Sequence, residues 1–153
     1  MTALAEALHA NRTLTSLDLS NAASNKASKL ALADMLRVNT ALTSLVLNGT
    51  EGGANGVGRV AEALRSNSTL TRLAWSANDG GNEGAEALAA VLRDNQTLLH
   101  LELSRCGIDE DGAAALIMML SVNDTLVHLD LSYNDVSDAA KDMLLAQLPT
   151  VIL

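Results

Sequence analysis

One nine-residue pattern recurs along this chain at a fixed spacing and limits what the chain can fold into. The pattern is LxxLxLxxN, where x is any residue, and its full form is Leu126-Val127-His128-Leu129-Asp130-Leu131-Ser132-Tyr133-Asn134. Related copies begin at Leu14, Leu42, Leu70 and Leu98, so the period is 28 residues. A constant period of this length is the sequence signature of a stacked-repeat protein.

The period divides the 153 residues into one domain of similar units. A leading half repeat covers 1–13, and five repeats follow at 14–41, 42–69, 70–97, 98–125 and 126–153. In each repeat the alternating leucines predict a short strand, and the apolar spacing that follows predicts a helix. Such a unit cannot bury its own apolar face, so neighbouring units stack. The sequence therefore predicts a right-handed α/β solenoid, with parallel strands on the concave face and helices on the convex face.

The motif and its period resemble the ribonuclease-inhibitor type of leucine-rich repeat. This type also occurs in NOD-like receptors, Ran GTPase-activating proteins and the C-terminal domain of tropomodulins. The resemblance covers all five repeats and the leading half repeat. It implies an arc that binds other proteins, but it does not identify the partner, because binding sites are grafted onto such scaffolds.

Several positions depart from the regular repeat or form columns of their own. An asparagine column (Asn11, Asn39, Asn67, Asn95 and Asn123) lies at the C-terminal ends of the helices, where asparagine tolerates left-handed backbone geometry. Gly52-Gly53 and Gly80-Gly81 replace apolar loop residues, whereas Ile108 and Val136 keep them. We therefore expect irregular, loosely packed loops in repeats 1–3 and regular loops in repeats 4–5. Trp75 stands where the motif has a leucine and is expected to fill the core.

The composition indicates a soluble chain with an aliphatic core. Hydrophobic residues make up 48% of the chain and aromatic residues 1%. No apolar run approaches the roughly 18 residues of a membrane span, and the first residues lack the features of a signal peptide. The single cysteine, Cys106, cannot form an internal disulfide and is expected to be a buried thiol. These features predict a cytoplasmic protein without membrane association.

The charge is negative overall and unevenly distributed. The net charge of −8 argues against a nucleic-acid partner. Residues 1–76 carry seven bases and five acids, whereas residues 77–153 carry three bases and thirteen acids. If the acidic half binds a protein, that protein is expected to present a basic face.

Alternate strand residues should line the concave face, and the loops after the strands should form its rim. The candidate partner-binding residues on this face and rim are Arg72, His100, Glu102, Arg105, His128, Asp130, Tyr133 and Asp135. Four of them (His100, Glu102, His128 and Asp130) should form a square with sides of about 5–7 Å. Such residues can bind a transition metal, but an open sheet face favours a solvated polar surface, so we predict no metal and no cofactor.

The predicted function is a non-enzymatic protein–protein interaction module, since no catalytic motif occurs. Two alternatives remain open. Residues 30–45 resemble the repeat domain of tropomodulin, which implies actin-filament capping. The Ran activator family implies a GTPase-activating scaffold. Apolar ends at Leu14–Leu19 and Val151–Leu153 indicate either a longer protein or end-to-end self-association.

Overall fold

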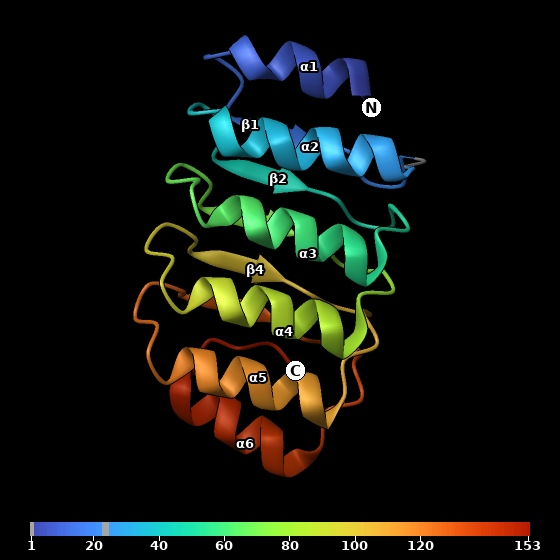
Figure 1. Cartoon of the computed structure of the whole chain (residues 1–153). Coiled ribbons are helices and arrows are strands. Elements are labelled where there is room, and N and C mark those ends of the chain that lie inside the picture. Colours follow the sequence, from blue (N-terminus) through green and yellow to red (C-terminus); the bar gives the residue numbers. More distant parts are fainter. Residues whose placement is uncertain (1, 23–24) are drawn as a thin grey trace.

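The computed structural model describes residues 2–22 and 25–153, in which helices and strands alternate strictly (Figure 1). The helices are α1 (Thr2–Ala10), α2 (Lys26–Val38), α3 (Gly53–Leu64), α4 (Gly81–Leu92), α5 (Glu110–Leu120) and α6 (Asp138–Gln147). The strands are β1 (Ser16–Asp18), β2 (Ser44–Val46), β3 (Arg72–Ala74), β4 (His100–Glu102) and β5 (His128–Asp130). The leading half repeat thus contributes a helix without a strand.

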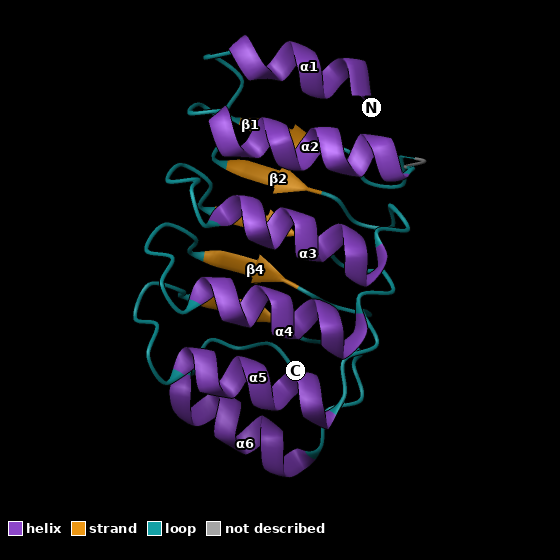
Figure 2. Cartoon of the chain, in the orientation of Figure 1, coloured by secondary structure: helices purple, strands orange, loops and turns teal. Residues whose placement is uncertain are grey.

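The strands form one parallel sheet in the order β1-β2-β3-β4-β5. Each residue of β1 to β4 pairs with the residue 28 positions later, as Leu45 does with Leu73 and Leu73 with Leu101. The helices form a second layer over one side of this sheet (Figure 2). The predicted α/β solenoid is confirmed. The 28-residue period of the sequence equals the offset between paired residues of neighbouring strands.

The core lies between the two layers because one leucine from each strand points toward the helices. Leu45, Leu73, Leu101 and Leu129 are all 0% exposed. Helix residues such as Leu36 and Leu88 meet them from the other side and are also 0% exposed. The buried side chains form a continuous cluster from α1 to the C-terminal tail. This common core fixes the outward direction of the alternate strand residues.

The asparagine column at the helix ends joins each repeat to the one before it. Asn67 donates through Nδ2 to the carbonyls of Leu36 (2.7 Å) and Asn39 (3.3 Å). Its Oδ1 accepts from the backbone N–H groups of Thr69 (3.0 Å) and Leu70 (2.8 Å). The tolerance of asparagine for left-handed geometry is not used at Asn39, whose backbone is extended, with φ −75° and ψ 127°. The column exists because the amide satisfies buried backbone groups that would otherwise lack partners.

The glycine-rich loop of repeat 2 is tightly packed, contrary to the expectation of loose packing there. Gly52 and Gly56 lie against the indole ring of Trp75, which is 2% exposed. The Asn78 Oδ1 atom accepts from the N–H groups of Thr50 and Gly52, both at 3.0 Å. The glycines of this loop therefore provide space for a large side chain. The corresponding loop of repeat 1 includes residues 23 and 24, which lie outside the described residues.

The helix starts fall into two groups, which follow the prediction from the loop sequences only in part. The helices α3 and α4 begin after Gly52 and Gly80, neither of which makes a side-chain capping bond. By contrast, the side chains of Asn25, Asp109 and Ser137 cap α2, α5 and α6. A capping side chain stabilises the first helical turn by about 1 kcal/mol. The expected difference from repeats 4–5 therefore holds for the helix starts of repeats 2 and 3, but not for repeat 1, where Asn25 and Ser28 form a capping box.

The C-terminal tail covers one end of the sheet, which corrects the expectation of two open apolar ends. Ile152 pairs with Asp130 in a parallel bridge. Its N–H donates to the Leu129 carbonyl (2.8 Å), and its carbonyl accepts from the Leu131 N–H (2.7 Å). Val151 is only 8% exposed. The tail thus acts as a short additional strand beside β5, and the edge of β5 is not available to another molecule.

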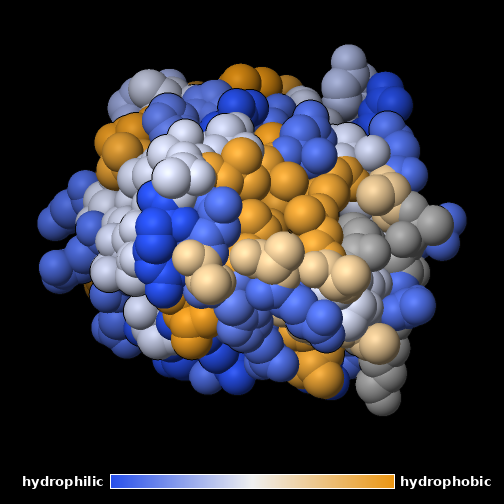
Figure 3. All heavy atoms as spheres, turned by 90° about the horizontal axis from the view of Figure 1, so that it is seen from above, coloured by the Kyte–Doolittle hydropathy of each residue, from blue (hydrophilic) through white to orange (hydrophobic). Residues whose placement is uncertain are grey.

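The N-terminal end of the solenoid, in contrast, remains open. Leu4 is 38% and Leu14 36% exposed, whereas the leucines that repeat Leu14 in the following turns are at most 4% exposed. Apolar atoms gather on this end when the molecule is viewed from above (Figure 3). None of the described helices is both long and apolar enough to span a bilayer.

Cys106 is part of the core beneath the strand ends. The residue is 3% exposed, and its thiol donates a hydrogen bond from Sγ to the Trp75 carbonyl oxygen at 3.3 Å. Removal from water disfavours the thiolate, so burial raises the pKa of the Cys106 thiol. The arrangement suits a structural thiol rather than a nucleophile.

We predict that alkylation of native Cys106 by iodoacetamide is at least about a hundredfold slower than alkylation of the unfolded chain, because the thiolate is the reactive form. Mass spectrometry over time, with and without urea, measures both rates. Comparable rates in the two conditions would show that the thiol is accessible in the native state.

Candidate functional site

The outward-facing strand residues form rows across the sheet, as the period predicts. One row contains Arg72, His100 and His128, and the next contains Ala74, Glu102 and Asp130. Both rows lie on the side opposite the helices, because the leucine between them in each strand is buried. We call these rows, together with the neighbouring row of Ser76, Ser104 and Ser132, the concave face. Five of the eight sequence-predicted site residues thus lie on one surface.

Arg72 and Glu102 form an ion pair that crosses diagonally between neighbouring strands. Arg72 Nη2 lies 2.7 Å and Nε 3.1 Å from Glu102 Oε1. The two side chains are 48% and 20% exposed, respectively. An ion pair this accessible contributes at most about 1 kcal/mol to stability. Its main effect is to hold one acid and one base in fixed positions in the middle of the face.

His100 and His128 lie side by side on β4 and β5. Their ring centroids are 5.6 Å apart and the rings are tilted by 43°. Both side chains are half-buried, and Glu102 and Asp130 follow them at the next outward position. The pair therefore offers two flat, partly apolar surfaces beside two carboxylates.

A row of small polar residues closes the concave face where the strands end. Ser132 Oγ donates to Ser104 Oγ (3.1 Å), and the Ser104 N–H donates to Ser76 Oγ (3.2 Å). In the next turn the Ser76 N–H donates to Asn48 Oδ1 (2.7 Å). At the far end, the hydroxyl and the backbone N–H of Ser20 donate to Asp18 and lower the pKa of its carboxyl. These short side chains make a shallow, hydrogen-bonding floor.

The rim next to this floor is set by a column of left-handed residues that the sequence did not reveal. Its members are Asn21 (φ 56°), Gly49 (62°), Ala77 (55°), Arg105 (54°) and Tyr133 (59°). They share no residue type, so no compositional signal marks them. The left-handed backbone at this position turns the chain out of the strand. Positive φ angles are uncommon in residues other than glycine, so their recurrence in each repeat marks a requirement of the turn.

Two members of this column, Arg105 and Tyr133, form an exposed stacked pair. The guanidinium carbon of Arg105 lies 4.6 Å from the centroid of the Tyr133 ring. Tyr133 remains 76% exposed. Tyrosine and arginine are enriched among residues that dominate protein interfaces. The spacing of 28 residues between them already placed them on adjacent turns.

Acidic residues continue from the rim to the helix starts. Asp109 caps α5 and also accepts from Asn82 Nδ2 at 2.6 Å. Glu110, Asp111 and Asp138 lie in the first turns of α5 and α6, where the helix dipole favours negative charge. Asp135, the remaining predicted site residue, is exposed in the loop before α6, and its N–H donates to the Ile108 carbonyl (2.9 Å).

The described residues include no group of three or more histidine, cysteine, aspartate or glutamate side chains arranged to hold a metal ion. His100, Glu102, His128 and Asp130 are neighbours, as their spacing predicts. However, Glu102 is paired with Arg72, and Asp130 Oδ1 accepts from the Ser132 N–H at 2.9 Å. The arrangement suits many separate polar contacts on a rigid surface.

Comparisons with known proteins agree with this architecture. The sequence profile of a family described as Leucine Rich repeat matches residues 10–23, 94–116 and 122–140. No protein with a curated description matches the sequence.

Three solved structures are similar in fold. Actin-binding site 2 of leiomodin-1 is 19% identical, with a TM-score of 0.83, and the match covers 95% of this chain and 86% of that one. The tropomodulin C-terminal domain from Caenorhabditis elegans is 14% identical, with a TM-score of 0.83 and coverage of 97% and 90%. A protein from Bacteroides fragilis is 19% identical, with a TM-score of 0.61 and coverage of 92% and 40%. At these identities, the matches establish the fold.

Proposed function

We propose that this chain, which has the fold of a leucine-rich repeat solenoid and matches a leucine-rich repeat profile in part, is a non-enzymatic module that binds a partner protein. The proposed site is the concave face and rim of repeats 3–5, with Arg72, His100, Glu102, Arg105, His128, Asp130, Tyr133 and Asp135 as its contact residues. A location in the cytoplasm belongs to the same proposal, on the basis of the single cysteine.

The observation that carries this proposal is the exposed Arg105–Tyr133 stack beside a fixed, charged face. Tyr133 exposes three quarters of its surface, although Arg105 already covers part of one ring face. A large aromatic side chain held in place loses little conformational entropy on binding. The surrounding carboxylates would attract a basic partner and orient it before contact.

We predict that reversing the charges of Glu102 and Asp130 slows association with the partner by about tenfold at low salt, since complementary charges mainly accelerate binding. The double variant E102K/D130K is compared with E6K/E62K, which makes the same charge change on the first and third helices. Stopped-flow or surface-plasmon measurements at two ionic strengths give the association rates. Equal rates for both variants, or no dependence on salt, would place the site elsewhere.

Actin is a second candidate partner, favoured by the fold shared with domains of leiomodin-1 and tropomodulin. In this case the chain would slow subunit addition at the pointed ends of actin filaments. Elongation of filaments with blocked barbed ends, followed by pyrene fluorescence, measures this effect. Unchanged elongation at saturating concentrations of the chain would remove actin capping from consideration.

A GTPase-activating scaffold is the less supported alternative. Arg105 is the candidate arginine on the rim, and it is stacked on Tyr133 rather than free to reach a bound nucleotide. A single-turnover GTPase assay that shows no acceleration would dismiss this function.

We also propose self-association through the N-terminal end of the solenoid, where Leu4 and Leu14 are exposed and one edge of β1 pairs with no other strand of the described residues. Burying a leucine of this kind stabilises an interface by about 1–2 kcal/mol. Sedimentation velocity should therefore show a larger species at high protein concentration that Leu14→Glu removes. Met143→Glu, which makes a comparable change on α6, should leave the larger species unchanged. A chain that sediments as a monomer at all concentrations would contradict this proposal.

A further inference from the structure

The two C-terminal helices carry an apolar groove on the convex side, away from the concave face. A hollow of about 180 Å³ is lined by Glu110, Ala114, Ile117, Met118, Ala140 and Met143. Met118 is 67% and Met143 56% exposed. The helices α5 and α6 pack together less extensively than the other neighbouring helices, which leaves this space between them.

The methionines are not required by the repeat. At the position of Met118, α2 and α3 carry Asp34 and Glu62, both charged and at the surface. At the position of Met143, α3 carries the exposed Arg59. The other helices of the repeats carry alanine or a charged residue at these two positions, so the fold does not require a large apolar side chain there, and methionine occurs at them only on α5 and α6. Unbranched, polarizable methionine side chains are typical of surfaces that adapt to a binding partner.

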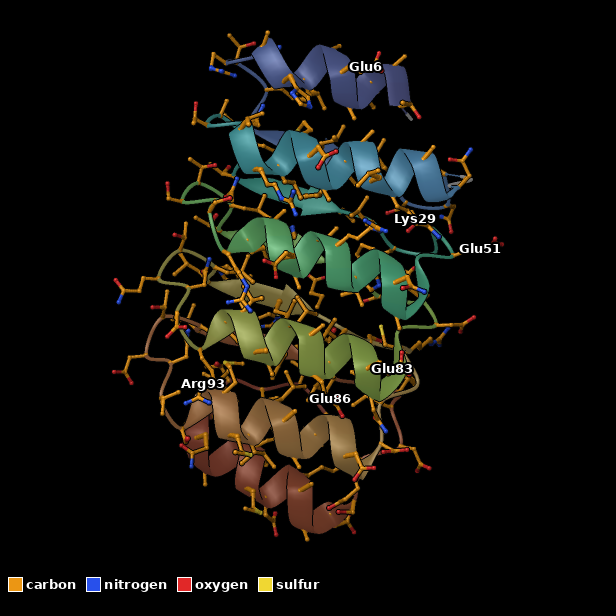
Figure 4. The ribbon with its side chains drawn as sticks, viewed as in Figure 1. Glu6, Lys29, Glu51, Glu83, Glu86 and Arg93 are labelled. Carbon is orange, nitrogen blue, oxygen red and sulfur yellow. The ribbon has the colours of Figure 1, made fainter. Side chains whose placement is uncertain are left out.

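The groove is bordered by carboxylates. Glu110 lines it directly, and Asp138 and Asp142 lie on the exposed side of α6. Glu86 on α4 points toward α5 (Figure 4). The one base on α5 or α6 is Lys141, which is already 3.5 Å from Asp138. An occupant of the groove would therefore contact apolar side chains inside it and negative charge along its edge.

We propose that this groove binds a basic amphipathic helix of a partner protein. Apolar side chains on one face of that helix would pack between Met118 and Met143, and its lysine or arginine residues would lie near Glu110, Asp142 and Glu86. The charge of the edge decides the occupant. Two α5–α6 faces of this chain would bring like charges together, whereas a basic helix is attracted. The proposal is independent of the function of the concave face.

The test uses a fluorescent, designed amphipathic peptide of about 14 residues of leucine and lysine, which is about four helical turns. Two control peptides have either the same composition in a non-amphipathic order or glutamate in place of lysine. Methyl NMR of methionine reports the site, since Met35 and Met119 are buried (0% exposed) and serve as internal references. The Met118 and Met143 methyl signals should shift when the amphipathic lysine peptide is added, and they should not shift with either control peptide.

Variants separate groove binding from general attraction to an acidic protein. Met118→Ser and Met143→Ser should each weaken peptide binding by about tenfold, the loss expected when one apolar side chain no longer packs against the ligand. Val38→Ser, at a site on α2 that is 48% exposed, should leave affinity unchanged. Equal binding of all three peptides, or equal effects of all three variants, would overturn the proposal. So would self-association that the two methionine variants abolish, because a second copy would then be the occupant.

Discussion

Gly52→Ala should destabilise the fold by about 3 kcal/mol, an unusually large effect for the addition of one methyl group, because the indole ring of Trp75 already fills the space that the methyl group would need. The new Cβ would collide with Trp75 Cζ2 and lie 2.8 Å from Cη2 of the same ring. Gly52 has φ −63° and ψ −38°, which alanine adopts freely, so the cost is steric and not conformational. Urea unfolding of the variant and the parent chain measures the difference.

A double variant isolates the cause. Leu47, Leu103 and Leu131 occupy the position of Trp75 in other repeats, so Trp75→Leu fits the column and removes the ring. Trp75 Nε1 is buried without a hydrogen-bond partner among the described residues, so this replacement also removes an unsatisfied donor. Gly52→Ala should cost less than about 0.5 kcal/mol in the Trp75→Leu background, a non-additivity typical of direct contact.

Gly58→Ala is the matched control. Its Cβ would meet only Ala87 Cβ, at 4.0 Å, in a helix where alanine is preferred over glycine by about 1 kcal/mol. It should therefore stabilise the chain. If Gly52→Ala is harmless next to Trp75, the loop is not packed tightly against the indole ring.

Asn67→Ala should destabilise the chain by about 3 kcal/mol, since it leaves buried backbone groups of two repeats without partners. The residue is 6% exposed, and its side chain makes two hydrogen bonds to the preceding repeat and three within its own turn. Asn67→Asp should be comparably harmful, because a carboxylate oxygen would face the Leu36 and Asn39 carbonyls. Denaturant unfolding gives both values.

Asn11→Ala tests the same column at the end of the stack. Asn11 Oδ1 accepts from the N–H groups of Thr13 and Leu14, but its Nδ2 has no acceptor among the described residues. Water can replace these exposed bonds, so the cost should be about 1 kcal/mol or less. Equal effects at positions 11 and 67 would contradict a role in joining repeats.

The regular features of the fold could be predicted because the repeat period equals the strand register. Leu45, Leu73 and Leu101 recur every 28 residues and therefore stack, and the same spacing places His100 beside His128. The Arg72–Glu102 ion pair could also have been predicted, because the period places this base and this acid on neighbouring strands, one outward position apart. The period alone therefore determines the strand order, the register and the rows of the concave face.

The remaining features depend on contacts between positions that the period does not relate. Trp75 and Gly52 belong to different columns, so no pattern in the sequence connects the glycines with the indole ring. Ile152 pairs with a residue 22 positions before it and not 28, because the chain turns at Pro149 after α6 ends. The groove between Met118 and Met143 depends on how far α5 and α6 separate, which is a property of side-chain packing.

Site-specific photo-crosslinking tests most directly whether the concave face and rim of repeats 3–5 bind the partner. A benzophenone amino acid in place of Tyr133, which is 76% exposed, should crosslink one specific protein in cell extract, and E102K/D130K in the same chain should abolish that product. The same amino acid in place of Glu62, exposed on the convex side of α3, should not capture it. Capture of the partner from position 62 and not from position 133 would contradict the proposed site.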